Sequence, residues 1–114
     1  HAERAAAHDL VDSGIDFDGA FCMTDTIAIG FVRGLADRGL RVPDDVAVIG
    51  FDGIRECEDY IPSLSTVATD LNDLAAKAMR LLLDRLDEDG KGTPLPARTL
   101  TADFRLIARE STRR

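Results

Sequence analysis

Short apolar runs alternate along the chain with longer segments in which apolar residues recur every three or four positions. The runs at 19–23 and 46–51 lack regular polar alternation, which is typical of strands covered on both faces of a parallel sheet. The segment 25–38 spaces its apolar residues as one helix face does, with Ala28, Phe31, Val32 and Leu35. Helices that alternate with buried strands predict an α/β fold, a parallel sheet layered between helices.

The remaining segments continue this pattern. We expect helices at 2–13, 54–60 and 71–88, and strands at 64–67 and between 98 and 108, with a break near Asp103. Gly39 followed by Leu40 predicts a left-handed helix end, and Pro43 prevents the helix from continuing. Residues 88–97 are rich in Gly and Pro and predict a flexible connection.

The charge of the chain argues against contact with nucleic acid. Its 114 residues include 21 Asp and Glu against 14 Lys and Arg, a net charge of −7. Binding to phosphate backbones requires clustered Lys and Arg, so we do not expect these residues to bind DNA. The chain has no apolar run long enough to span a bilayer and no signal-peptide core at its start, so a cytoplasmic protein without a membrane partner is expected.

The residues that often carry chemistry are scattered. Cys22 and Cys57 are not spaced as a CxxC pair, and a disulfide between them would be unusual in a reducing cytosol. His1 and His8 do not complete a metal site with them, so we expect neither a metal nor a cofactor. No nucleophile, base and orienting group stand at recognisable spacing, and an enzyme is therefore not expected.

Four strings carry a family resemblance. They are Cys22–Gly30 (CMTDTIAIG), Gly39–Asp52 (GLRVPDDVAVIGFD), Pro62–Val67 (PSLSTV) and Leu106–Ser111 (LIARES). In the same order they resemble C-x-N-D-x-x-A-x-G, G-L-x-V-P-x-D-V-x-V-x-G-F-D, P-x-L-T-T-V and L-x-x-R-E-S, the motifs of the LacI/GalR family of bacterial transcription regulators. The four strings occur in the family's order within a resemblance that extends over about residues 3–112, so the resemblance is specific.

The resemblance implies a periplasmic-binding-protein-like type I fold, truncated, in which two α/β subdomains enclose a small-molecule cleft. It implies that about 1–67 and 104–112 form the C-terminal subdomain. Residues 68–103 would supply a helix and a strand that cross to the N-terminal subdomain. We expect the N-terminal subdomain, a helix-turn-helix and one strand to lie outside this chain, and DNA to be contacted only through the N-terminal domain.

Asp52 is the first candidate for effector binding. It follows a buried strand, and ligands of open α/β sheets bind beyond the carboxyl ends of the strands. A carboxylate accepts up to about four hydrogen bonds and suits the hydroxyls of a sugar or ribose, the use that the family makes of this Asp. The alternative is a turn residue that bonds its own backbone.

Three further positions are effector-site candidates by resemblance. Thr24 stands where the family usually carries a ligand-contacting Asn. Its single hydroxyl has fewer hydrogen-bond donors than the Asn amide. Asp25 is expected to be the helix N-cap more than a direct contact. Thr69 lies at the crossing between the subdomains, where other members often place a polar residue near the effector.

Several apolar positions are candidates for an interface. Ile27 and Ile29 lie off the core face of the helix at 25–38, and the family pairs through this helix and the segment that matches Tyr60. We expect a homodimer contact there, the alternative being burial within the same domain. The apolar residues at 71–88 span too wide an arc for a helix packed on one side. We interpret Arg109 and Glu110 as surface ion-pair residues.

These observations favour the effector-sensing and dimerisation domain of a transcription regulator, which binds a sugar or nucleoside and changes the spacing of distant DNA-binding heads. The alternative on the same fold is the solute-binding protein of a sugar transporter, which would require secretion. A phosphoacceptor receiver domain is disfavoured. It needs a Lys beyond a strand, and the only lysines, Lys77 and Lys91, lie in a predicted helix and a connection.

Overall fold

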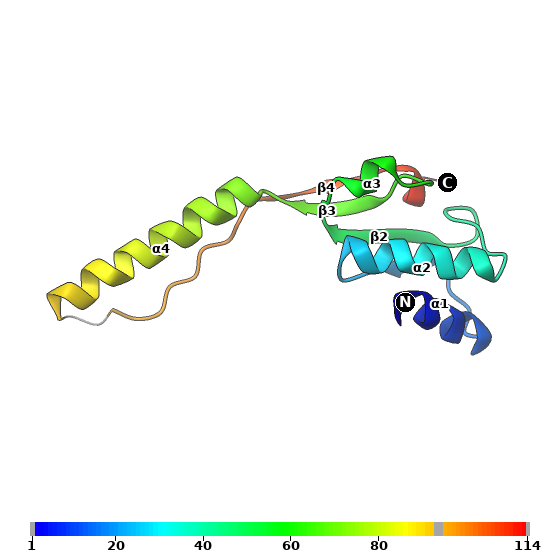
Figure 1. Cartoon of the computed structure of the whole chain (residues 1–114), viewed down its shortest axis with the longest axis horizontal. Helices are drawn as coiled ribbons and strands as arrows, with labels where there is room; N and C mark the ends of the chain where they lie inside the picture. The colour runs from blue at the N-terminus through cyan, green and yellow to red at the C-terminus, as the bar shows by residue number, and fades with distance from the viewer. Residues whose placement is uncertain (1, 93–94, 114) are drawn as a thin grey trace. The chain divides into compact units, whose positions relative to one another are not determined.

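The chain folds into a four-stranded sheet with helices between the strands (Figure 1). The computed structural model describes residues 2–92 and 95–113. In chain order the elements are α1 (Ala2–Asp12), β1 (Gly19–Phe21), α2 (Asp25–Asp37), β2 (Ala47–Asp52), α3 (Glu56–Asp59), β3 (Ser65–Thr69), α4 (Leu71–Lys91), β4 (Phe104–Ile107) and the 3₁₀ turn η1 (Glu110–Thr112).

The sheet has the strand order β1-β2-β3-β4. The pairs β1–β2 and β2–β3 are parallel, with Phe21 opposite Ile49 and Asp52 opposite Ala68. This confirms the predicted α/β class with a parallel sheet. Because the strands run the same way, the carboxyl ends of β1 and β2 lie at one edge of the sheet, and Asp52 lies at that edge.

The described residues divide into two compact units. One, which we call the sheet unit, lies within residues 1–68 and 105–114, and the other, the helix unit, within residues 69–104. The boundaries expected from the sequence, after residue 67 and before residue 104, fall within one residue of these. The assignment of the units to two subdomains of the family stays a prediction.

The core of the sheet unit lies between α2 and β2. The predicted face of α2 is buried, and Leu35 is fully so, as is Val48 on β2. Helix α1 lies beside α2, where a Cβ at Gly34 would come within 2.5 Å of the Ala7 Cβ (Figure 1). Each large apolar side chain buried here contributes about 1.5–3 kcal/mol, so this layer holds the sheet unit together.

The end of α2 follows the predicted pattern. Gly39 has a positive φ of 77°, and the Leu40 amide donates to the carbonyl oxygen of Leu35 at 3.0 Å. This closes the helix with the left-handed turn that glycine adopts at little cost.

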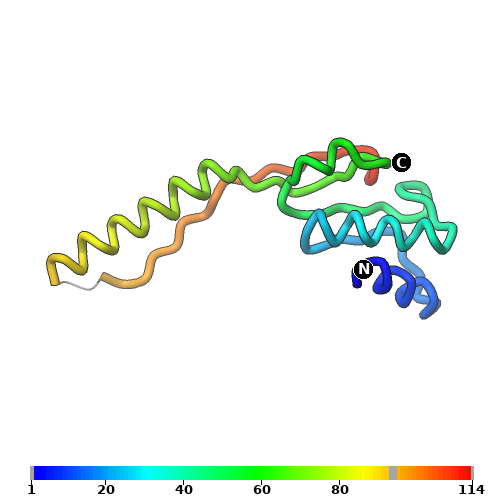
Figure 2. The backbone as a smooth tube through the Cα atoms, viewed as in Figure 1, coloured from blue at the N-terminus to red at the C-terminus, as the bar shows by residue number. Residues whose placement is uncertain are grey.

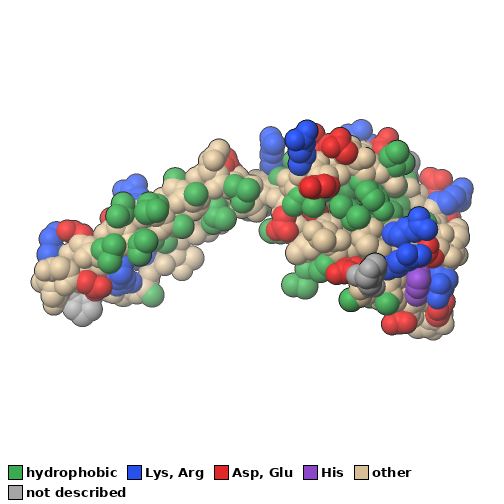
Figure 3. Space-filling view, in the orientation of Figure 1, with side chains coloured by type: hydrophobic (Ala, Val, Ile, Leu, Met, Phe, Trp, Pro, Cys, Tyr) green, Lys and Arg blue, Asp and Glu red, His purple; other side chains and the backbone are tan. Residues whose placement is uncertain are grey.

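The helix unit consists of α4 and the segment that follows it. Residues 95–103 run back along the helix (Figure 2). Polar contacts hold them there, since Lys77 donates to the Thr101 carbonyl at 2.8 Å and Asp73 accepts from the Asp103 amide at 2.8 Å. None of the described residues of α4 is buried. Hydrophobic side chains along the helix are therefore exposed to solvent (Figure 3).

Two differences from the sequence prediction lie in the helix unit. Helix α4 continues to Lys91, which pairs with Asp87 one turn earlier, and it ends at Gly92 with a φ of 68°. The predicted flexible connection therefore begins later, and its residues 93–94 lie outside the described part. Residues 98–103 form no strand, because side chains of α4 rather than a neighbouring strand bind their backbone.

Arg109 and Glu110 do not pair with each other as a surface ion pair. Arg109 binds Glu58 at 3.0 Å, and Glu110 accepts from the Ser63 amide at 2.8 Å. These contacts bring the C-terminal segment against α3 and against the loop before β3. Within residues 2–92 and 95–113, no helix is long and apolar enough to cross a membrane.

Candidate functional site

Asp52 is exposed and has a strained backbone. It is the last residue of β2, and its φ is +119°, in a region that residues with side chains rarely adopt. Such a conformation costs about 1–3 kcal/mol and persists where the surroundings enforce it, most often at functional sites. The structure therefore places an unusual, accessible carboxylate at the edge where the sequence predicts the ligand.

The residue after Asp52 cannot carry a side chain. Gly53 has a φ of +80°, and a Cβ there would lie 2.5 Å from the Ala68 Cβ on β3. The turn is thus packed closely against the neighbouring strand. A glycine is required both for the backbone angle and for this approach.

Asp25 holds the other side of this turn. Its side chain is fully buried, and its Oδ2 accepts from the Gly53 amide at 2.6 Å and the Ile54 amide at 2.9 Å. Asp25 therefore joins the first turn of α2 to the backbone that follows Asp52. The spacing of the residues gave no sign of this contact, which spans 28 positions in the chain.

The prediction that Asp25 is the N-cap of α2 is wrong. The cap is Thr24, whose hydroxyl accepts from the Ile27 amide at 3.2 Å. Asp25 is already inside the helix, where it faces the sheet beneath Gly50. A Cβ at Gly50 would lie 2.2 Å from the Asp25 Oδ1, so this glycine makes room for the carboxylate.

Thr24 and Thr69 lie in different units. Thr24 follows β1 at the same edge of the sheet as Asp52 and is half-buried; after capping, its hydroxyl keeps a hydrogen to donate. Thr69 is the last residue of β3 and falls in the helix unit. Contact of either residue, or of Asp25, with an effector stays a prediction.

Of the predicted interface residues, Ile27 and Ile29 lie on α2 and Tyr60 directly follows α3. Ile29 and Tyr60 are half-buried against the core, and the Tyr60 hydroxyl donates to the Ile29 carbonyl at 3.3 Å. Ile27 is more exposed. Tyr60 also lines a groove of about 410 Å³ between the second half of α2 and residues 39–42 and 60–62, which neither Ile27 nor Ile29 lines. Burial in the same unit thus accounts for part of this pattern, and the dimer contact stays a prediction.

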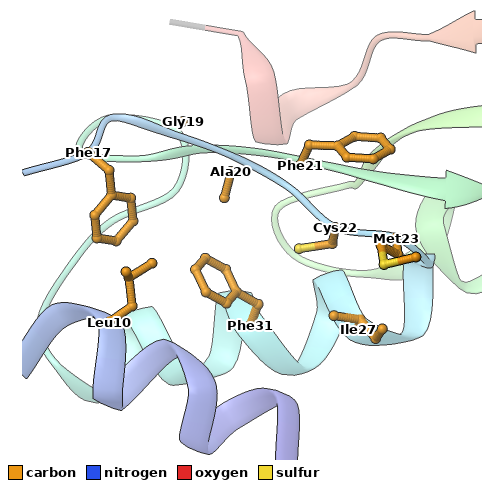
Figure 4. A pocket seen from close by; sticks show the side chains of 9 residues that line it. All are labelled: Leu10, Phe17, Gly19, Ala20, Phe21, Cys22, Met23, Ile27 and Phe31. Atoms are coloured by element: carbon orange, nitrogen blue, oxygen red, sulfur yellow. The ribbon is translucent and has the colours of Figure 1, made fainter. Parts of the chain in front are cut away.

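An apolar pocket of about 420 Å³ lies along β1 (Figure 4). Leu10, Phe17 and Phe31 point into it, whereas the ring of Phe21 points to the opposite side of the strand and is 63% exposed. The pocket offers no charged side chain to bind hydroxyl groups. Asp52, which offers a carboxylate, is therefore the better candidate for binding a polar effector.

Both cysteines are free and buried, including Cys57, which the sequence places in a polar stretch. Burial raises the pKa of Cys22 to about 11. Burial, followed by the adjacent Asp25 carboxylate, raises the pKa of Cys57 to about 12. Both thiols are therefore protonated and unreactive at neutral pH. Among the described residues, no three His, Cys, Asp or Glu side chains are grouped to hold a metal.

Comparison with known proteins identifies the family. The model of the periplasmic binding protein-like domain matches residues 1–112. The chain belongs to this family. It is 37% identical over 93 residues to the HTH-type transcriptional repressor PurR of Actinobacillus pleuropneumoniae, which covers 82% of the chain and 27% of that relative.

Two solved structures have the same fold. A LacI family transcriptional regulator from Arthrobacter sp. FB24, in complex with lactose, is 39% identical with a TM-score of 0.80, over 98% of this chain and 41% of that one. A complex of the transcriptional regulator CelR with cellobiose is 33% identical with a TM-score of 0.82, over 96% and 32%. These relatives confirm the resemblance to LacI/GalR regulators. The chain spans less than half of each.

Proposed function

We propose that this domain senses a small polyhydroxylated molecule, of the sugar or nucleoside class, within a DNA-binding transcription regulator. The observation that carries the proposal is Asp52, an exposed carboxylate held in a strained conformation at the carboxyl end of a parallel strand. Strain that the rest of the fold must offset is better explained by a ligand contact than by an ordinary turn.

The relatives support the chemical class and the type of protein. The Arthrobacter regulator is in complex with lactose and CelR with cellobiose, both rich in hydroxyl groups. PurR is a transcriptional repressor, and a solved structure of similar fold shows the Lac repressor dimer bound to operator. By analogy, this domain acts without catalysis in a cytoplasmic homodimer and reaches DNA only through an N-terminal domain outside residues 1–114. Because these relatives are regulators, they favour this function over that of a transporter's solute-binding protein.

The mechanism is a shift in population. In the complete protein, the sheet unit supplies one wall of the effector cleft through Asp52 and Thr24. The effector stabilises the arrangement in which it contacts both walls, and only its differential affinity for the two arrangements can move the equilibrium. Residues 68–103 cross between the two subdomains, and α4 packs on the N-terminal subdomain.

A thermal-shift screen of the complete protein tests the proposal. The panel contains lactose, cellobiose, further mono- and disaccharides and purine and pyrimidine nucleosides. We expect at least one compound to raise the melting temperature increasingly with its concentration, because a ligand that binds only the folded state stabilises it. The shift should be largely lost in Asp52→Asn. It should be kept in the control Asp45→Asn, because Asp45 precedes the start of β2, at the end of the strand away from Asp52. A panel in which no compound gives a concentration-dependent shift contradicts the proposal.

A further inference from the structure

The geometry points to Asp25 as a positioning residue that imposes the strained conformation of Asp52 and so orients the carboxylate offered to the effector. This inference rests on the proposed function only for what Asp52 binds. The positioning itself follows from contacts inside the sheet unit.

The first step is the attachment of Asp25. One carboxylate oxygen receives the amide hydrogens of two consecutive residues, Gly53 at 2.6 Å and Ile54 at 2.9 Å. Hydrogen bonds to a charged acceptor are about twice as strong as neutral ones. Asp25 lies in the first turn of α2, so these two hydrogen bonds join the start of that helix to the turn after β2.

The second step is the close packing of the backbone on both sides of Asp52, which leaves the turn no room to move. Gly53 is pressed against Ala68, where a Cβ would come within 2.5 Å of the Ala68 Cβ. Gly50 lies beneath Asp25, where a Cβ would come within 3.0 Å of its Cα. The backbone from 50 to 54 is thus fixed at both flanks of Asp52.

These contacts determine the backbone conformation of Asp52, which lies between Gly50 and Gly53. Register with β3 fixes Asp52 opposite Ala68, and the Asp25 carboxylate fixes the amides immediately after it. Asp52 must span them with a φ of +119°. If the Asp25 contacts were removed, the turn could relax and the strain would be released.

A double-mutant cycle measures this coupling without any effector. In the complete protein, Asp52→Gly should raise the melting temperature, because glycine adopts positive φ without strain. In an Asp25→Ala background, which removes the oxygen that accepts both amides, the same change should give no rise, or a fall, because the turn has already relaxed. The matched control is Asp45→Ala, since the Asp45 carboxylate also accepts a backbone amide, that of Arg41 at 2.8 Å. In that background Asp52→Gly should keep its full effect.

The chemical shifts of amide protons provide a second test if a variant folds incompletely and its melting temperature cannot be measured. The Gly53 and Ile54 amide protons of the wild-type protein should resonate downfield and should move upfield in Asp25→Ala, which removes their acceptor, but not in Asp45→Ala. Equal effects of Asp52→Gly in the wild-type and Asp25→Ala backgrounds, or amide shifts that do not respond to Asp25→Ala, would overturn the inference.

The double-mutant cycle and the effector affinity of Asp52→Asn test the positioning role of Asp25 and the proposed function separately. A positive cycle with effector affinity unchanged in Asp52→Asn would support the positioning contact and refute the effector role of Asp52. An absent coupling with affinity lost in Asp52→Asn would refute the positioning role alone.

Discussion

The hydroxyl of Ser111 donates a hydrogen bond of 2.6 Å to the carbonyl oxygen of Val48, 63 positions earlier in the chain. The same hydroxyl accepts from the Ser65 amide at 2.8 Å, so one buried side chain joins the C-terminal turn η1 to both β2 and β3. This contact explains in physical terms why the last of the four motifs ends in serine.

Replacing Ser111 with Ala should destabilise the domain by about 1–3 kcal/mol, because the Val48 carbonyl and the Ser65 amide would lose their partner in a buried site. The control is Ser13→Ala, which removes an exposed hydroxyl bonded to the Leu10 carbonyl and should cost less than about 0.5 kcal/mol. Urea denaturation measures both. Equal costs would show that the buried bridge contributes nothing specific.

Gly50→Ala should also destabilise the domain, by about 1–3 kcal/mol, because its Cβ would lie 2.2 Å from the Asp25 Oδ1. Gly90→Ala is the opposite case. Nothing lies within 4 Å of its position in α4, so the added methyl should stabilise the helix by about 0.5–1 kcal/mol. Thermal unfolding separates the two, and a stabilising Gly50→Ala would disprove the close packing of Asp25 on Gly50.

The pH dependence of stability should have a component from Asp37. A hydrogen bond from Arg4, with further help from His8 and Arg33, lowers its pKa from 3.8 to about 2. Because the folded-state pKa is depressed, the stabilisation is present above about pH 4 and is lost as pH falls towards 2. The melting temperatures of wild type and Asp37→Asn should differ most near pH 5 and converge near pH 2. A constant difference would exclude this linkage.

The isolated 114-residue chain should associate with itself through α4. The helix exposes Leu71, Leu74, Met79, Leu82, Leu83 and Leu86. An exposed patch of this kind marks an interface, and a second copy can cover it in a symmetric dimer. Sedimentation at high micromolar concentration should show association, weakened more by Leu74→Asp with Leu82→Asp than by Ile29→Asp. A strict monomer, or the reverse order of effects, would contradict this prediction.

The sequence predicted the elements whose signals are local. The apolar run of β2 and the buried face of α2 depend on neighbouring residues, and the left-handed turn at Gly39 depends on glycine itself. The end of α4 was misplaced because Gly90 inside the helix resembles a stop, although the pair of Lys91 with Asp87 continues it.

The site could be predicted only in part, for the same reason. Asp52 follows a recognisable strand, so its place at the sheet edge was foreseeable. The role of Asp25 depends on a contact with Gly53, and that of Arg109 on Glu58, which lies 51 positions away. Such partners are set by the packing of α2 and η1, which no local spacing encodes. Gly50 and Gly53 were the available signals, since a glycine inside or just after a strand often marks a close approach.

The central claim is that Asp52 binds the effector. The most direct measurement is a calorimetric titration of the complete protein with the compound that the thermal-shift screen selects, repeated for Asp52→Asn, Asp52→Ala and Asp45→Asn. Each hydrogen bond to a carboxylate contributes about 1.5–3 kcal/mol, so the Asp52 variants should bind about ten- to a hundredfold more weakly while Asp45→Asn binds normally. Unchanged affinity in Asp52→Asn and Asp52→Ala would contradict the claim.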